Sequence, residues 1–316
     1  MSHPLPLSQK AQQQSSGPHL SAELIPAMLT PFKRDESIDF EKAEQLAIYL
    51  ADHGCDGILV NGTTGEAPTL SFEEKIELLK VVKHAVRGKN VQIVAGIGSN
   101  DTRKTVEEAK KTAAIGVDAL LTVVPYYNKP SQRGMIEHFR RVAQAVDTEI
   151  VIYNIPSRCV VLMNPETMAA LHQQCPNIIG VKQSHPDMDQ VSEITVRLPQ
   201  ESWRTWCGDD SLTVPMMSCG AYGTFSVLAH LTGDLLREMI GAVKANDRQR
   251  ALELHLKQLN LGREIFFLPN PTVIKTCMAK LGLMDSVMRS PMVQPDDAEM
   301  ARIDKLMVEY KSLIRA

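Results

Sequence analysis

The stretch GILVNGTTGEAPTLSFEEKIELLKVVKHAV, residues 57–86, contains one complete strand-and-helix unit. Its first residues form a short apolar run without alternation, which is typical of a strand covered on both faces. A segment with helical spacing follows, and its apolar residues share one face. These residues are Phe72, Ile76, Leu79, Val82 and Val86. Ser71 stands before this segment and Glu74 follows three residues later, a capping-box pattern that marks a helix start.

The same unit recurs along the chain. The eight strand candidates are ELIPAMLTPF (23–32), GILVNG (57–62), VQIVAGIG (91–98), ALLTVVP (119–125), EIVIYNI (149–155), IIGVKQS (178–184), RTWCGDD (204–210) and GTFSV (223–227). Eight strand-then-helix units predict an α/β fold of the (β/α)₈ TIM-barrel type, with an open doubly wound sheet as the alternative. After about Leu231 only helical patterns continue. We therefore expect a barrel over residues 22–246, which carries the active site, and a small helical domain over residues 247–316.

Composition restricts the class of protein. The chain has 316 residues, of which 44% are hydrophobic and 22% charged, as in ordinary globular proteins. A net charge of −3 gives no reason to expect nucleic acid or an acidic membrane surface as a partner, and no apolar run is long enough to span a membrane. Six scattered cysteines favour reduced thiols and a cytoplasmic location. The polar residues 1–21 lack the apolar core of a signal peptide, and we expect a disordered tail there.

The sixth strand candidate ends on a lysine, in NIIGVKQS (177–184). A lysine at the end of an apolar strand either extends to water or acts as a nucleophilic amine that forms a Schiff base with a carbonyl. Catalytic groups of (β/α)₈ barrels lie at the carboxyl ends of the strands. The predicted fold therefore favours a chemical role for Lys182.

Other strand ends carry further candidates. The second strand runs into NGTTG, where Gly62, Thr63 and Thr64 offer backbone and hydroxyl donors for a carboxylate or phosphate; the alternative is an ordinary turn that caps the next helix. Two tyrosines, Tyr126 and Tyr127, follow the fourth strand. Tyr153 and Arg158 follow at the fifth, where a tyrosine could transfer protons through a relay and an arginine could hold a carboxylate.

Several motifs are absent or incomplete. AGIGSND has an aspartate where a dinucleotide-binding fingerprint needs its third glycine, and the nine histidines show no metal-binding spacing. Asp209 and Asp210 resemble a magnesium site, but two acids after the seventh strand equally suit a helix start, which we favour. We therefore expect neither a cofactor nor a metal.

These motifs together resemble the dihydrodipicolinate synthase and N-acetylneuraminate lyase superfamily of Schiff-base aldolases. GILVNGTTGEAPTLSFEE and the pair YNIP and GVKQS carry the resemblance, supported by TVVPYYNKPSQRGMIEHF, GDDSLTVPM and PNPTVIK. It extends from AMLTPF to RSPMV, which is most of the chain. The expected activity is the lyase-type condensation of pyruvate with aspartate 4-semialdehyde, on the route to diaminopimelate and lysine.

The resemblance also implies roles for residues. Lys182 matches the lysine that condenses with the ketone of pyruvate, and Tyr153 matches the acid/base tyrosine. Tyr127 and Thr63 match the proton relay. Thr64 matches the threonine that holds the pyruvate carboxylate. The other substrate-binding matches are Arg158 for the carboxylate of the aldehyde, Tyr126 for a residue that crosses a dimer interface, and Gly208 and Phe225 for the walls. Gly62, in the NGTTG turn, is also expected to bind substrate. The family is usually a homotetramer, built as a dimer of dimers.

Departures from the family pattern lie near the second substrate. Cys159-Val160 stands where Thr-Gly or Ser-Gly is usual, and Gln183 to Pro186 replaces Glu-Ala-Ser/Thr-Gly. Two alternatives therefore stand beside the synthase. One is another pyruvate-dependent class I aldolase or dehydratase that acts on a sugar acid or related ketoacid. The other is a non-catalytic paralogue that binds a ketoacid or a partner protein.

Regulation is predicted from the same resemblance. Lysine-inhibited members hold the inhibitor at the dimer interface with histidines and a glutamate, and Phe72, Lys75 and Lys104 stand at the matching positions. A cationic Lys104 repels an ammonium group. Weak or absent inhibition by lysine is therefore expected.

Overall fold

The computed structural model describes residues 17–314, and its centre is a ring of eight parallel strands. The strands are β1 (Leu24–Pro26), β2 (Gly57–Val60), β3 (Gln92–Ile97), β4 (Ala119–Val123), β5 (Glu149–Asn154), β6 (Ile178–Gln183), β7 (Arg204–Cys207) and β8 (Gly223–Ser226). Each strand pairs with its neighbours in sequence, and β1 pairs with β8. The ring meets at an isolated bridge between Ala27 and Leu59, where the Met28 amide donates to the Leu59 carbonyl at 2.9 Å. The fold is a nearly closed, TIM-like barrel, which excludes the open doubly wound sheet.

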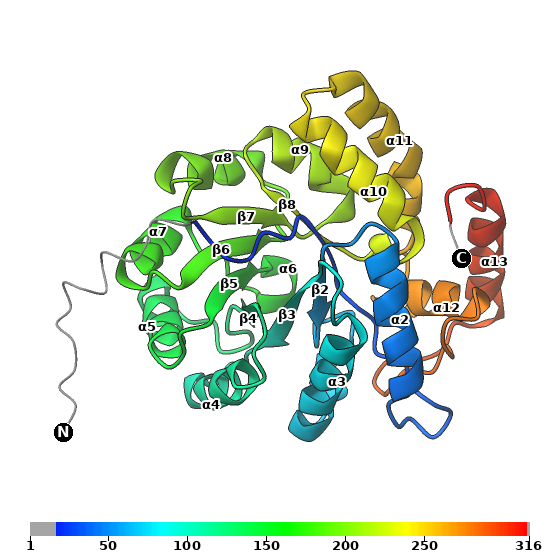
Figure 1. The fold of residues 1–316 in the computed structure, drawn as a ribbon, viewed down its shortest axis with the longest axis horizontal. Helices are drawn as coiled ribbons and strands as arrows, with labels where there is room; N and C mark the ends of the chain where they lie inside the picture. The colour runs from blue at the N-terminus through cyan, green and yellow to red at the C-terminus, as the bar shows by residue number, and fades with distance from the viewer. Residues whose placement is uncertain (1–16, 315–316) are drawn as a thin grey trace.

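Helices surround the strands (Figure 1). They are α2 (Phe40–Asp52), α3 (Phe72–Ala85), α4 (Thr102–Ala113), α5 (Gln132–Ala143), α6 (Pro156–Cys159), α7 (Pro165–Gln174), α8 (Met188–Arg197), α9 (Thr213–Ser218), α10 (Ala229–Lys244), α11 (Arg248–Glu264), α12 (Thr272–Lys280) and α13 (Asp297–Glu309), with 3₁₀ turns η1 (Ala67–Thr69) and η2 (Asp210–Leu212). All eight strand predictions are confirmed.

Helix α3 begins as its sequence predicts. The Ser71 hydroxyl accepts the Glu74 amide at 3.1 Å, and the Glu74 carboxylate accepts the Ser71 amide at 2.8 Å. This reciprocal pair satisfies two of the donors that every helix start leaves open. Of the predicted apolar face, the last three residues, Leu79, Val82 and Val86, are buried. Phe72 and Ile76 are only half-buried, and Phe72 lies at the wall of a cavity.

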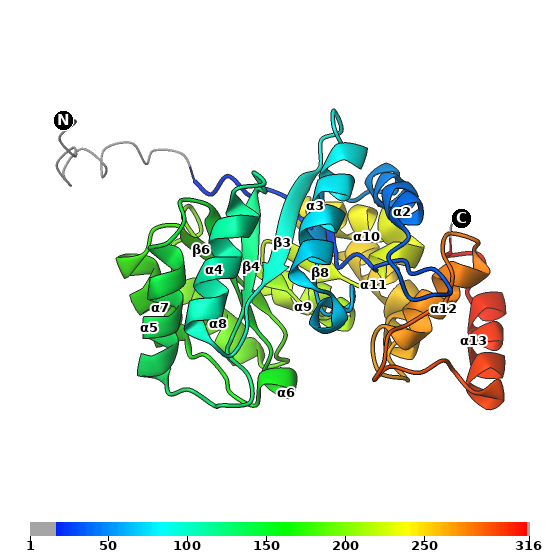
Figure 2. The same cartoon turned by 90° about the horizontal axis from the view of Figure 1, so that it is seen from below.

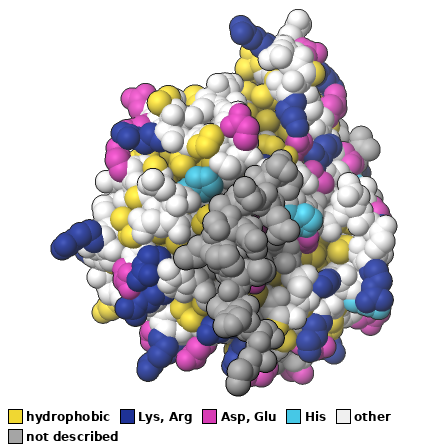
Figure 3. Space-filling view, turned by 60° about the vertical axis from the view of Figure 1, so that its left-hand side comes forward, with side chains coloured by type: hydrophobic (Ala, Val, Ile, Leu, Met, Phe, Trp, Pro, Cys, Tyr) yellow, Lys and Arg dark blue, Asp and Glu magenta, His cyan; other side chains and the backbone are white. Residues whose placement is uncertain are grey.

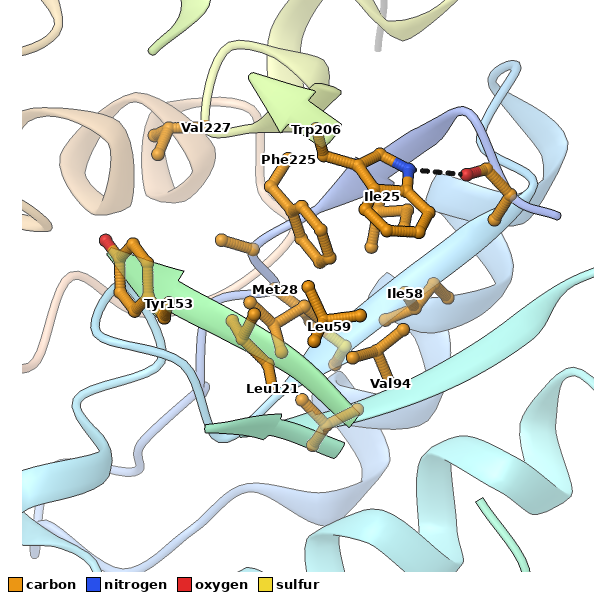
Figure 4. Packing of buried hydrophobic residues seen from close by; sticks show 14 of the residues in the cluster. Ile25, Met28, Ile58, Leu59, Val94, Leu121, Tyr153, Trp206, Phe225 and Val227 are labelled. Atoms are coloured by element: carbon orange, nitrogen blue, oxygen red, sulfur yellow. Dashed lines mark hydrogen bonds between the residues drawn. The ribbon is translucent and has the colours of Figure 1, made fainter. Parts of the chain in front are cut away.

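The barrel interior is filled by apolar side chains from many strands (Figure 4). Trp206 is fully buried there, and its indole N–H donates to the Ala22 carbonyl at 2.9 Å. Gly180 is required beside it, because a Cβ at this position would stand 2.1 Å from the Arg204 carbonyl oxygen and 2.8 Å from the Trp206 ring. The glycine of NIIGVKQS thus lets the sixth strand approach the seventh, two residues before Lys182.

The last helices, α11 to α13, continue beyond the barrel. Helices α12 and α13 lie on the side of α2 and α10, away from α5 and α7 (Figures 1 and 2). Lys275 of α12 is completely buried, and its ammonium is 2.6 Å from the carboxylate of Glu66, in the turn after β2. Burial lowers the pKa of Lys275 to about 8, although Glu66 favours its charged form.

The segment before β1 packs against the barrel. Leu20 is fully buried, and its amide donates to the Glu149 carboxylate at 2.8 Å. The Tyr222 hydroxyl donates to the Ser21 carbonyl at 3.0 Å. Residues 17–21, which the sequence assigns to a disordered tail, are therefore part of the packed structure, because distant strands supply partners for their backbone. Residues 1–16 of the predicted tail lie outside the described residues.

The surface mixes charges of both signs. On the face in Figure 3, acidic and basic side chains of the described residues are interspersed. Within residues 17–314, no helix combines the length and the apolar character that a membrane span requires.

Two buried histidines, His138 and His230, make stability depend on pH, because burial lowers the pKa of each to about 4. His230 is fully buried; its Nδ1 donates to the Val227 carbonyl at 2.9 Å and its Nε2 accepts the Leu29 amide at 3.3 Å. Burial lowers the pKa of His230 to about 4. Between about pH 6.5 and pH 4 the unfolded chain binds a proton that the folded chain does not, so stability falls as the pH falls.

We therefore predict that His230→Gln, which keeps an acceptor for Leu29, flattens this dependence by roughly 1 kcal/mol per pH unit between pH 6 and pH 5. Urea unfolding of both proteins across this range measures it. Equal slopes for the variant and the parent chain would contradict the assignment.

Candidate active site

A cavity of about 880 Å³ opens at the carboxyl ends of the strands. Most of the site residues predicted from the sequence line it. These are Gly62, Thr63, Thr64, Tyr126, Tyr153, Arg158, Lys182, Gly208 and Phe225. They come from six strand ends and the loops that follow, and the barrel brings them together although they are spread over more than 160 positions.

Lys182 stands near the end of β6 with its amine toward the cavity. The residue is 6% exposed, and Nζ lies 4.3 Å from the centre of the Tyr153 ring and 5.3 Å from that of Phe225. Within residues 17–314 no carboxylate pairs with this amine, whereas the other buried lysine, Lys275, is paired with Glu66. The Lys182 nitrogen therefore faces aromatic rings and open space, an arrangement that suits a nucleophile.

Space for this lysine depends on Gly208. A Cβ at Gly208 would lie 2.0 Å from the Ser184 hydroxyl and 3.1 Å from Cε of Lys182. The Ser184 hydroxyl donates to the Gly208 carbonyl at 3.3 Å, so the ends of β6 and β7 are held together at this point. A larger residue at position 208 would displace the amine.

The turn after β2 supplies two hydroxyl groups. Thr63 is half-buried, and Thr64 is buried with its side-chain oxygen 2.9 Å from the amide nitrogen of Asn270. Glu66 ends the turn in the left-handed region, at φ 55°, and is held by Lys275. The turn is thus anchored from outside the barrel.

The two neighbouring tyrosines face different ways. Tyr126 is 39% exposed and lines the cavity, whereas Tyr127 is 86% exposed and does not contribute to the wall. Tyr127 also adopts a positive φ of 72°, which costs free energy for a residue other than glycine. Within one described chain, the structure does not bring Tyr127 to Lys182.

The short helix α6 carries the candidate arginine at the cavity wall. Arg158 is exposed, and Cys159 beside it is buried against the cavity. Burial raises the pKa of the Cys159 thiol to about 11, so it is neutral near pH 7. Val160 follows in the left-handed region at φ 64°, the position where helices usually place glycine.

Two residues of the second departure from the family pattern, Gln183 and Ser184, face opposite sides of the sheet at the end of β6. Ser184 lines the cavity. Gln183 is fully buried on the other face, where its carbonyl accepts the Asn154 amide at 3.0 Å and its amide donates to Gln190. Since a neutral amide satisfies this network, the missing carboxylate at position 183 does not change the charge of the cavity wall.

The paired acids after β7 adopt the expected helix-start role. Asp209 caps η2 by accepting the Ser211 amide at 3.1 Å. Asp210 is buried and accepts the amides of Val227 and Leu228, at 2.9 and 3.0 Å, just before α10. Burial raises the pKa of Asp210.

Asn270 is a cavity residue that the sequence analysis does not single out. It lies within PNPTVIK, where no local periodicity or spacing connects it with a turn 206 positions earlier. Only the folding of α12 back against the barrel places it beside Thr64.

Comparisons with known proteins agree with this geometry. The model of the dihydrodipicolinate synthetase family matches residues 20–309. A 4-hydroxy-tetrahydrodipicolinate synthase from Dehalococcoides mccartyi is 40% identical over 287 residues, which cover 91% of this chain and 96% of that protein. The crystal structure of dihydrodipicolinate synthase from Aquifex aeolicus superposes with a TM-score of 0.89 at 39% identity, covering 93% of this chain and 100% of that one. The chloride-inhibited dihydrodipicolinate synthase from Acinetobacter baumannii, complexed with pyruvate, gives 0.89 at 31% identity, with coverages of 93% and 100%.

The strained backbone at Val160 generates a prediction. Its side chain is exposed, so little buried area is lost on truncation, while a β-branched residue at positive φ is unfavourable. Val160→Gly should stabilise the protein by about 0.5–1 kcal/mol, the left-handed penalty less the entropy cost of glycine. Thermal and urea unfolding measure the change. Val160→Ala, which keeps a Cβ, is the matched control and should gain less; a destabilised Val160→Gly would refute the strain.

Proposed function

The chain belongs to the dihydrodipicolinate synthetase family, and we propose that it condenses pyruvate with L-aspartate 4-semialdehyde to give 4-hydroxy-tetrahydrodipicolinate. This lyase reaction lies on the route to diaminopimelate and lysine. The observation that carries the proposal is the amine of Lys182, which is buried, faces the cavity and has no carboxylate partner within residues 17–314.

The reaction begins when the unprotonated amine of Lys182 attacks the ketone of pyruvate. Loss of water gives an imine, which acidifies the methyl group, and removal of one methyl proton gives an enamine. The enamine carbon attacks the aldehyde, and the new alkoxide takes a proton. The amino group of the second substrate then attacks the imine carbon, which closes the ring and releases Lys182.

The proposed roles follow from position. Tyr153, whose ring lies beside the Lys182 amine, is the acid/base, with Thr63 in its relay. Thr64 holds the pyruvate carboxylate. Arg158 on the cavity wall meets the carboxylate of the aldehyde, as a bidentate donor. The walls next to the ketoacid are formed by Gly62, Gly208 and Phe225.

We also propose a homotetramer, built as a dimer of dimers. The exposure of the two tyrosines favours moving the interface-crossing role from Tyr126 to Tyr127, which keeps its role in the proton relay. In this proposal Tyr126 stays with the cavity of its own chain, and Tyr127 completes the relay in a second copy; the exposure and strained backbone of Tyr127 support this role. A cytoplasmic location is supported by the cysteines, since all six are free thiols.

A second candidate is a pyruvate-dependent aldolase or dehydratase that acts on a sugar acid. Cys159 and Ser184, two of the departures from the family pattern, lie on the cavity wall and favour it. Gln183 gives it no support, because this side chain faces the polar network behind β6. Arg158 suits either substrate, since both carry a carboxylate.

Turnover of aspartate semialdehyde, measured with pyruvate and a coupled downstream reductase, tests the function. We expect robust turnover that falls by more than roughly a thousandfold in Lys182→Ala and in Lys182→Arg, since removing a covalent nucleophile causes losses of this scale. Borohydride should trap pyruvate on the parent chain and on neither variant. Trapping without turnover would support the second candidate and direct the assay to sugar-derived ketoacids, and the absence of trapping would refute both.

Weak or absent inhibition by lysine remains a prediction. The cavity lining includes Lys75, Lys104 and Lys111 together with Glu73, Glu107 and Glu108, and the Lys75 ammonium pairs with the Glu108 carboxylate at 3.1 Å. A titration of activity with L-lysine should show little loss, whereas Lys104→Glu should become more sensitive, because a carboxylate attracts the ammonium that Lys104 repels. Potent inhibition of the parent chain would contradict this.

A further inference from the structure

Three contacts from the C-terminal part of the chain converge on the turn that carries Thr64. The Asn270 amide nitrogen is 2.9 Å from the Thr64 hydroxyl oxygen. Lys275 pairs with one oxygen of Glu66 at 2.6 Å, and the Arg289 backbone amide donates to the other at 3.0 Å. The Glu66 contacts fix the backbone of the turn, whereas Asn270 is the one residue among 17–314 that bonds to the Thr64 side chain on the cavity wall.

The direction of this hydrogen bond decides what Thr64 offers to a ligand. A threonine hydroxyl has one proton to donate and two lone pairs to accept. When the Asn270 amide donates to one lone pair, the Thr64 proton stays available for another acceptor. No acceptor for it occurs in the described part of the chain, and the side chain lines the cavity. A carboxylate there would receive a hydrogen bond.

A hydrogen bond donated by Thr64 to Asn270 would make the site unfavourable for a carboxylate. If the Asn270 carbonyl faced Thr64, the hydroxyl would donate its proton to the protein and present lone pairs to the cavity, where a carboxylate would be repelled. In the structure the Asn270 amide nitrogen is the atom that contacts the Thr64 hydroxyl, at 2.9 Å, and the Asn270 carbonyl oxygen is buried without a partner among residues 17–314.

We infer that Asn270 is a positioning residue for the carboxylate of the ketoacid: its amide orients the Thr64 hydroxyl so that the proton points into the cavity. This inference rests on the proposed function, in which Thr64 holds the carboxylate of pyruvate. It also gives the C-terminal helices a part in substrate binding, since Asn270 stands immediately before Pro271, the residue that caps α12.

Two substitutions separate orientation from mere contact. Asn270→Ala removes the donor and leaves the Thr64 hydroxyl free to rotate. Asn270→Asp keeps the size of the side chain but, when ionised, only accepts hydrogen bonds. The Thr64 hydroxyl would then donate to Asp rather than into the cavity, and a negative charge would stand beside the carboxylate of pyruvate. The readout is the pyruvate concentration that half-saturates borohydride trapping on Lys182, at pH 8, together with the limiting trapping rate.

We expect this concentration to rise about five- to tenfold in Asn270→Ala and more than about fiftyfold in Asn270→Asp, with limiting rates within about threefold of the parent chain. Asn260→Ala and Asn260→Asp, at an exposed position of α11, are matched controls and should leave it unchanged. Melting temperatures show whether each variant folds.

If the half-saturating pyruvate concentrations of Asn270→Ala and Asn270→Asp were equal, the inference would be overturned, because the contact itself and not the direction of the hydrogen bond would then matter. A loss confined to the limiting rate would overturn it too, since a purely structural role predicts that pattern. In either case trapping by the parent chain leaves the proposed function intact. Failure of the parent chain to trap pyruvate would overturn both.

Discussion

The buried ion pair between Glu66 and Lys275 is the constraint on which the site depends. Both residues are almost completely enclosed, and 2.6 Å separates the carboxylate from the ammonium. Removing one partner of such a pair leaves an uncompensated buried charge, which costs about 3–5 kcal/mol. The turn after β2 and the helix α12 are therefore bound to each other, and the hydroxyl groups of Thr63 and Thr64 take their positions from a part of the chain that follows the barrel. The pair supports the site without entering it.

Two buried lysines show how the surroundings decide a residue's role. Lys275 has a carboxylate and serves as an anchor, whereas Lys182 lies between the rings of Tyr153 and Phe225 and opens on the cavity. The barrel makes this difference possible, because parallel strands bring their carboxyl ends to one rim while the interior below is filled by large side chains such as Trp206. The amine is held in place by packing rather than by charge.

The positions that depart from the family pattern illustrate which changes a site tolerates. Gln183 lies behind the sheet, in a hydrogen-bond network that a neutral amide completes, so the loss of a carboxylate there does not change the charge of the cavity wall. Cys159 faces the cavity but is a neutral thiol near pH 7. Val160 keeps the left-handed backbone that glycine would adopt more easily. The changes therefore affect one wall of the cavity and the stability of the backbone, and they leave Lys182 untouched.

The sequence by itself determined the eight strands, the start of α3 at Ser71 and the location of Lys182 at a strand end, because each rests on local periodicity or capping chemistry that a few neighbouring residues complete. Only the tertiary structure decided which face of β6 receives Gln183 and which of Tyr126 and Tyr127 meets the cavity, since adjacent residues at a strand end or in a loop can face opposite ways. It also decided that Leu20 packs under the barrel and that Asn270 reaches Thr64. Those contacts join residues more than a hundred positions apart, and no local pattern in a single sequence encodes such a distance.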